Sequence, residues 1–99
     1  MIKKTLGVEP WKIEEIRRHL QERFPENEID CFARGQHAAH LFLVLKADPR
    51  EKNRVVHQLL ITKRFFDRFT DQGSLATALA AGEVVLRMIQ ASDRTVELY

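Results

Sequence analysis

The first quarter of the chain alternates apolar and charged positions with the period of a helix. Between residues 9 and 24 the apolar side chains recur at steps of three and four: Ile13, Ile16, Leu20 and Phe24. This spacing predicts an amphipathic helix, because residues three and four apart share one helical face. Pro10 suits the first turn of that helix, and Pro25 stops it. The opposite face carries charged residues, among which Glu14 and Arg18 are spaced for a weak ion pair.

Two runs with the composition of strands follow this helix. The segments EIDCFAR (28–34) and HAAHLFLVLK (37–46) are separated by Gly-Gln, which predicts a hairpin with a two-residue turn. If Arg34 and His37 flank that turn, Cys31 lies opposite His40. The second run is nearly continuous in apolar residues, so we expect it inside the sheet with a neighbour on each side, and a third strand is needed.

The segment ADPRE resembles the start of a second helix. Asp48 is suited to cap it, Pro49 fits its first position, and Glu51 is placed as in a capping box. We expect this helix to run over residues 48–69. Its core-facing positions would be apolar residues in both halves: Val55, Val56, Leu59, Leu60, Phe66 and Phe69.

The remaining segments complete the fold expected from the sequence. Ser74 is predicted to cap a third helix, while residues 83–91 suit either a helix or a strand, and a helix is favoured. The final TVELY is read as a short strand that pairs with the hairpin. The predicted order is αββααβ: one small α+β domain over residues 1–99, with a three-stranded antiparallel or mixed sheet and helices packed on one face.

Composition narrows the class of protein. A hydrophobic fraction of 44% and a charged fraction of 30% are typical of a soluble domain. No stretch approaches the roughly 18 apolar residues that a membrane span requires. The two lysines near the start precede no apolar run, so no export signal is expected, and a single cysteine suits a reducing compartment. We therefore expect a cytoplasmic protein that makes no membrane contact.

Positive charge is concentrated in the middle of the chain. The net charge is only +2, which by itself does not argue for nucleic-acid binding. Residues 50–70, however, hold six basic and two acidic side chains. On a helix over this segment, one face would carry Arg54, His57, Arg64 and Arg68. This basic stripe predicts a cationic surface for nucleic acid or for an acidic protein partner, and the simpler alternative is a solvated helix face.

The histidines and the cysteine raise the question of a metal site. On a strand, His37 and His40 point to opposite faces, so they cannot share one metal ion. Cys31 and His40, which are predicted to lie opposite each other, are better placed to share a metal ion. Two ligands do not complete zinc coordination, however, so His57 or a second subunit would have to contribute. The alternative is a buried cysteine beside a histidine.

The sequence contains no recognisable set of catalytic residues. There is no Gly-rich phosphate loop and no GxSxG, and no nucleophile has an obvious base except Cys31 with His40. We therefore expect a binding module without catalytic activity and without a cofactor. The exposed edge of a three-stranded sheet predicts a homodimer. A structural interaction module built on Phe65, Phe66 and Phe69 is a further alternative.

The predicted layout resembles a known family. The αββααβ order, the glycine-turned hairpin before a capped helix, and RVVHQLL on that helix are similar to the BolA-like proteins, which share a class II KH-type topology. Arg54 and His57 are nearest to the family's basic motif. The family's histidine shortly before the last strand has no counterpart, since no histidine follows His57, and no GxxG loop is present. The resemblance implies nucleic-acid binding, or partnership with a monothiol glutaredoxin around an iron–sulfur cluster with a histidine ligand.

Overall fold

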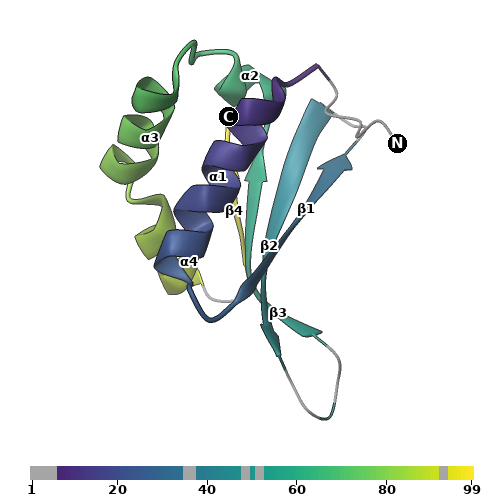
Figure 1. Ribbon diagram of the computed structural model, residues 1–99. Helices are drawn as coiled ribbons and strands as arrows, with labels where there is room; N and C mark the ends of the chain where they lie inside the picture. The colour runs from purple at the N-terminus through teal and green to yellow at the C-terminus, as the bar shows by residue number, and fades with distance from the viewer. Residues whose placement is uncertain (1–6, 35–37, 48–49, 51–52, 92–93) are drawn as a thin grey trace.

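The computed structural model describes residues 7–34, 38–47, 50, 53–91 and 94–99, and these form an α+β fold (Figure 1). The α+β class expected from the sequence is confirmed, but the sheet has four strands rather than three. The elements in chain order are α1 (Pro10–Arg23), β1 (Glu28–Arg34), β2 (Ala39–Ala47), β3 (Asn53–Ile61), α2 (Lys63–Phe66), α3 (Gln72–Ala81), α4 (Val84–Ala91) and β4 (Thr95–Leu98).

The four strands lie in the order β1-β2-β3-β4. The pairs β1–β2 and β2–β3 are antiparallel, and the pair β3–β4 is parallel. A parallel pair needs a long crossover, and α2, α3 and α4 supply it. The expected pairing of the terminal strand with the hairpin is wrong in detail, because β4 joins β3 and not β1 or β2.

The helix expected over residues 48–69 is wrong. Its middle is strand β3, and only Lys63–Phe66 are helical, as α2; the predicted start at Asp48, Pro49 and Glu51 lies outside the described residues. β2 is apolar on both faces and needs a neighbour on each side, and the β-branched segment after it supplies one. Leu59 and Ile61 then reach the core with a period of two, whereas Val55 is 39% exposed.

The hairpin of β1 and β2 forms with a register different from the expected one. Cys31 lies opposite Phe42, and His40 lies opposite Ala33. The closing pair is Arg34 with Ala39, so the connection is longer than a two-residue turn. A shift of two residues keeps every side chain on its expected face but changes its partner.

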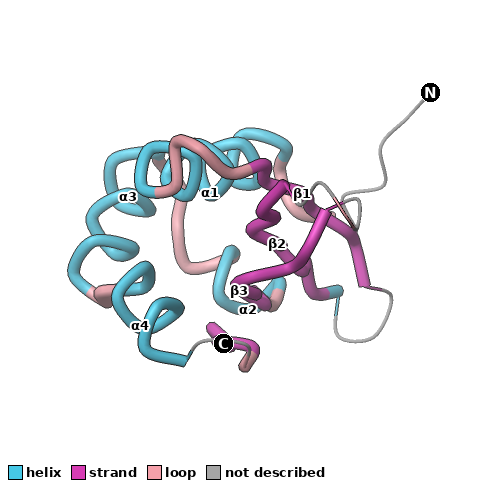
Figure 2. Tube along the Cα trace, turned by 90° about the horizontal axis from the view of Figure 1, so that it is seen from below, coloured by secondary structure: helices cyan, strands magenta, loops and turns pink. Residues whose placement is uncertain are grey.

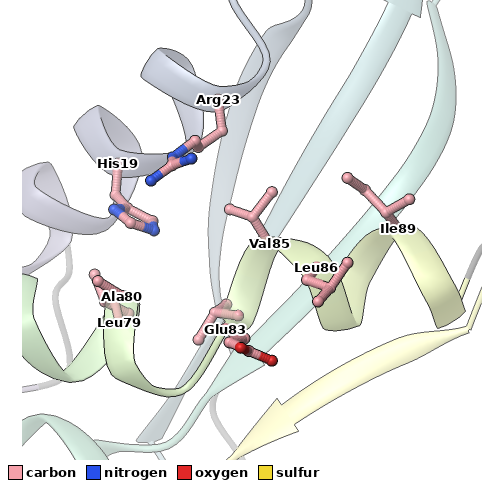
Figure 3. A pocket seen from close by; sticks show the side chains of 9 residues that line it. His19, Arg23, Leu79, Ala80, Glu83, Val85, Leu86 and Ile89 are labelled. Carbon is pink, nitrogen blue, oxygen red and sulfur yellow. The ribbon is translucent and has the colours of Figure 1, made fainter.

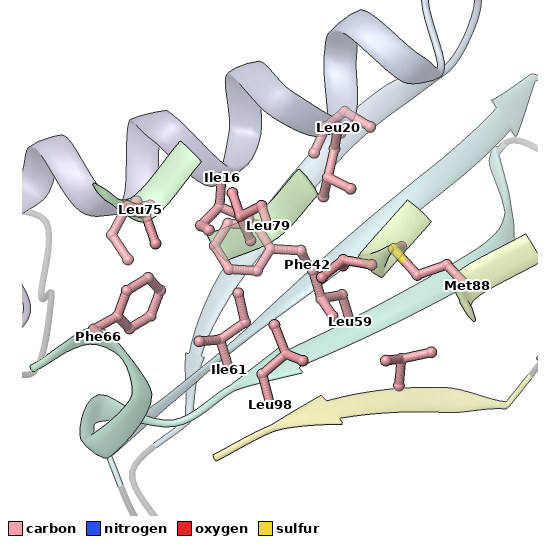
Figure 4. Packing of buried hydrophobic residues seen from close by; sticks show 14 of the residues in the cluster. Ile16, Leu20, Phe42, Leu59, Ile61, Phe66, Leu75, Leu79, Met88 and Leu98 are labelled. Carbon is pink, nitrogen blue, oxygen red and sulfur yellow. The ribbon is translucent and has the colours of Figure 1, made fainter. Parts of the chain in front are cut away.

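The core lies between the sheet and the helices (Figure 4). α1 contributes Ile16 and Leu20, both fully buried. The sheet and the C-terminal helices contribute the remaining large side chains of the cluster, which include Phe42, Leu59, Ile61, Phe66, Leu75, Leu79 and Met88. α1, α3 and α4 all lie on one side of the sheet (Figure 2), which confirms the expected packing on one face.

The charged face of α1 is partly buried, which the sequence did not indicate. Lys12 is 3% exposed, and its Nζ donates a hydrogen bond of 2.8 Å to the backbone oxygen of Phe66. Glu15 is 2% exposed and accepts hydrogen bonds from Gln72 and Arg18. These contacts satisfy buried polar groups and tie α1 to α2 and to the start of α3.

The C-terminal helices differ from the expectation at their ends. Asp71 caps α3, because its carboxylate accepts from the backbone nitrogen of Ser74 at 2.8 Å, so Ser74 is not the cap. Residues 83–91 are helical from Val84 onward, as favoured. Between α3 and α4, Glu83 has a φ of 50°, a left-handed conformation that turns the chain from one helix into the next.

Candidate functional site

The four residues of the predicted basic stripe do not share a surface. Arg54 lies near the start of β3, and His57 lies three residues on, whereas Arg64 is in α2 and Arg68 follows it. Seven residues of strand separate Arg54 from Ile61, which is roughly 23 Å at about 3.3 Å per residue. The stripe was a consequence of the expected helix, and the strand divides it into two groups.

The two groups have different surroundings. His57 is half-buried opposite Val44, with its ring 5.3 Å from the ring of Phe24. Arg64 is exposed, and the guanidinium of Arg68 lies 6.0 Å from the centre of the Phe65 ring. His57 therefore belongs to the margin of the core, and the arginines remain as surface charges.

Arg54 instead has a new neighbour, Lys46 on β2. The register places the two residues directly opposite each other, and both are exposed. Neither forms an ion pair or a side-chain hydrogen bond with any residue that the structure describes. Like charges in directly opposed positions destabilise a sheet. The sequence held a signal for this pair, since Lys46 and Arg54 are placed symmetrically about the β2–β3 connection.

Cys31 and His40 share the core-facing side of the sheet but are not opposed. His40 is 2% exposed, and neither ring nitrogen has a hydrogen-bond partner among the described residues. Its ring meets that of Phe66 edge to face at 5.9 Å, and burial lowers the pKa of the imidazole. The described residues contain no group of three side chains able to hold a metal ion. His37 lies outside the described residues.

The phenylalanine cluster is not an exposed interface. Phe66 is fully buried, and Phe65 and Phe69 are half-buried against the core with their ring centres 5.2 Å apart. Phe65 also contacts Phe66, with ring centres 6.4 Å apart, so two ring contacts join the three phenylalanines to the core. Phe66 therefore cannot belong to an exposed patch, and a structural interaction module on these residues stays a prediction.

A pocket of about 340 Å³ opens between α1 and α4 (Figure 3). His19 and Arg23 from α1 form one wall, and the opposite wall is largely apolar, with Val85, Leu86 and Ile89 of α4. Burial and the charge of Arg23 lower the pKa of His19. No feature of the sequence predicts this pocket, because its size depends on how far α4 lies from α1.

The pocket combines an apolar floor with few polar groups. Its only carboxylate among the described lining residues is Glu83, and no serine, threonine or cysteine lines it. A histidine without a neighbouring nucleophile or a metal ligand set does not make a hydrolytic or transfer site. The pocket can hold an apolar group against α4, with the side chains of His19, Arg23 and Glu83 placed to contact a polar or charged part of the same ligand.

No protein-family model matches the chain, and no curated protein and no solved structure is detectably similar to it. The segment RVVHQLL, which carried the resemblance to BolA-like proteins as part of a helix, lies in β3. In the part of the chain that the structure describes, no single helix is long and apolar enough to cross a membrane; α3 and α4 meet the criterion only together, by length and composition, with a bend of 43° between them.

Proposed function

We propose that the protein is a non-catalytic nucleic-acid-binding module that contacts phosphates with the end of its β2–β3 hairpin. The opposed pair of Lys46 and Arg54 supports this proposal. Two cations in directly opposed positions weaken the hairpin, and no described acid compensates them. A phosphate bound between the two side chains removes the repulsion and gains charge-assisted hydrogen bonds.

The shape of the hairpin end supports the same function. In Figure 1 the strands β2 and β3 extend past the ends of α1 and α4, so no described helix covers them there. A two-stranded ribbon fits the major groove of duplex DNA, which is about 12 Å wide. The basic end of the hairpin can therefore approach a phosphate backbone without rearrangement of the core.

The arginines at the other end of β3 are a matched comparison. Arg64 and Arg68 are also exposed and also carry two positive charges, but they follow the far end of β3, which is roughly 23 Å from Arg54 along the strand. If binding follows only the net charge of the protein, both pairs contribute equally. If the hairpin makes the contact, the pair of Lys46 and Arg54 dominates.

The test is a titration of tagless protein with a short labelled DNA duplex and with single-stranded RNA at about 50 and 200 mM salt. Two double variants are compared with the wild type: Lys46→Gln with Arg54→Gln, and Arg64→Gln with Arg68→Gln. The hairpin variant should bind at least about tenfold more weakly and lose nearly two units from the slope of log K against log salt. The α2 variant should lose less than about threefold.

Three outcomes would overturn the proposal. The first is absence of binding by the wild type at low salt. The second is an equal loss in the two double variants, which would reduce the effect to net charge. The third is binding of poly-glutamate as tightly as DNA at equal charge, which would assign the hairpin end to an acidic protein.

A further inference from the structure

The side of the sheet away from the helices is apolar at its centre. On β2, Phe42 and Val44 point into the core and are fully buried, whereas the alternating Leu41 and Leu43 point to the other side and are partly exposed. Phe32, which lies opposite Leu41, is 52% exposed. Together with Leu60 of β3, opposite Leu41 on its other side, these residues form what we call the outer patch: Phe32, Leu41, Leu43 and Leu60.

An uncovered sheet face normally has polar side chains. In an antiparallel sheet with one solvated face, polar residues alternate with apolar ones along each strand. The centre of β2 does not alternate, since Leu41, Phe42, Leu43 and Val44 are all apolar. The molecule measures 41 × 34 × 21 Å, and its short dimension is that of two layers, a sheet and a helical layer. The outer patch therefore has the composition of a buried layer.

Both edges of this face carry charged residues. On β1, the acidic Glu28 and Asp30 lie on this side together with Arg34, with Asp30 directly opposite Leu43, and on β4 the charged residue on this side is Glu97. Arg34 lies on edge strand β1, two residues from Phe32 and therefore on the same side of the sheet. Glu97 lies on edge strand β4, in the same row as Phe32, Leu41 and Leu60. Arg34 and Glu97 are both exposed. They stand at the same end of the sheet, on opposite edges.

We infer that the outer face binds a second copy of this chain, face to face. A two-fold axis parallel to the strands and lying between the sheets places β1 of each copy over β4 of the other. Arg34 of each copy then faces Glu97 of its partner, and the two outer patches meet at the centre. The other two-fold axis in that plane brings each edge strand over its own copy. Arg34 then faces the acidic half of its partner's β1, and Glu97 no longer has Arg34 opposite it, so a loss of association in Glu97→Arg distinguishes the two axes.

The dimensions agree with such a pair. Packed sheets are about 10 Å apart, a gap that an arginine and a glutamate side chain bridge from the two edges. The apolar centre is small, so we expect a dissociation constant in the micromolar range rather than an obligate dimer. This inference concerns a surface that the proposed nucleic-acid contact does not use.

Sedimentation velocity of the full chain between about 1 and 500 µM tests the surface. The wild type should shift from monomer to dimer over this range. Leu43→Lys should remain monomeric at every concentration while it keeps the far-ultraviolet circular dichroism of the wild type. The matched control is Leu86→Lys, which changes a leucine on α4 that is more exposed than Leu43, at 46%, and should dimerise like the wild type.

Exchanging the charges of Arg34 and Glu97 tests whether the outer patch binds a second copy of the chain and which two-fold axis relates the two copies. Arg34→Glu alone and Glu97→Arg alone should each weaken the dimer by about tenfold, and the double variant should restore it to within about threefold of the wild type. Because Tyr99 donates a hydrogen bond of 2.9 Å to Glu97, Tyr99→Phe is included and should leave the dimer unchanged.

The inference is wrong if the wild type stays monomeric up to the highest concentration. It is also wrong if Leu86→Lys abolishes the dimer and Leu43→Lys does not. Failure of the double charge exchange to restore association would overturn the proposed axis and, with it, the pairing of β1 over β4.

Discussion

At the scale of single residues, His40 makes folding depend on pH. Burial lowers the pKa of its imidazole, and no described group accepts or donates a hydrogen bond at either ring nitrogen. Below about pH 6.5, the usual histidine value, the unfolded chain takes up a proton there that the folded chain does not. The stability is therefore complete above this pH and falls as the pH falls below it. His19 acts in the same direction, because its pKa is also lowered.

Urea unfolding at about pH 7.5 and 5.5 measures this effect. The wild type should be less stable at the lower pH, and His40→Leu should lose a large part of that difference because the buried site no longer titrates. His19→Gln is the comparison at a half-buried position and should remove a smaller part. Equal pH dependence in the wild type and His40→Leu would show that His40 is not the buried titrating group.

At the scale of elements, Thr62 joins three of them. Its hydroxyl accepts from the backbone nitrogen of Phe65 at 3.3 Å and donates to the backbone oxygen of Leu98 at 3.3 Å. It thus ends β3, caps α2 and holds the end of β4. The residue is 7% exposed, so removal of the hydroxyl takes two hydrogen bonds out of a buried junction, although the Phe65 nitrogen and the Leu98 oxygen keep backbone hydrogen bonds to Thr62.

Thr62→Val should lower the free energy of unfolding by about 1 to 2 kcal/mol, the usual range for loss of a helix cap with a buried hydrogen bond. Thr62→Ser keeps the hydroxyl and should cost clearly less. Urea denaturation of both variants at neutral pH provides the measurement. If the two variants are equally destabilised, the methyl group and not the hydroxyl makes the contribution.

Elements with one clear periodicity could be predicted from the sequence, and β3 could not. The steps of three and four that predicted α1 leave no strand alternative. Residues 83–91 suited a helix or a strand, and the favoured helix is α4. In β3 the paired residues Val55–Val56 and Leu59–Leu60 satisfy a helical and a strand pattern equally well. The choice depends on β2, which needs a second neighbour, and that requirement lies outside the segment itself.

The residues of the candidate site could not be predicted for the same reason, because they depend on how the strands pair. The basic stripe followed from placing Arg54, Arg64 and Arg68 on one helix, and it disappeared with that helix. The pair of Lys46 and Arg54 depends on the register of β2 with β3, which includes an irregularity between Val44 and Leu45 that the sequence does not mark. Predicting a contact between two strands therefore requires their register, and the charge content of the sequence does not reveal that register.

At the scale of the whole molecule, the two proposals share one geometry. A two-fold axis parallel to the strands leaves the direction of each strand unchanged, so both β2–β3 hairpins of the dimer project from the same end. β2 and β3 are the central strands, so the cations Lys46 and Arg54 of both copies lie at this end of the dimer. Lys46 alternates in step with the core-facing Val44, so each pair points to the helix side of its own copy. The four cations therefore lie at one end of the dimer, on its two outer sides. Their repulsion opposes dimerisation, and a bound polyanion removes it.

Nucleic acid should therefore strengthen the dimer, and by linkage the dimer should strengthen nucleic-acid binding by the same factor. Sedimentation of fluorescently labelled protein, with and without a short DNA duplex at about 50 mM salt, should show at least about fivefold tighter association when DNA is present. Lys46→Gln with Arg54→Gln should dimerise more tightly than the wild type without DNA and should not respond to it. If DNA does not change the dissociation constant of the wild-type dimer, the two surfaces act independently. The hairpins then lie at opposite ends of the dimer, as the alternative axis requires.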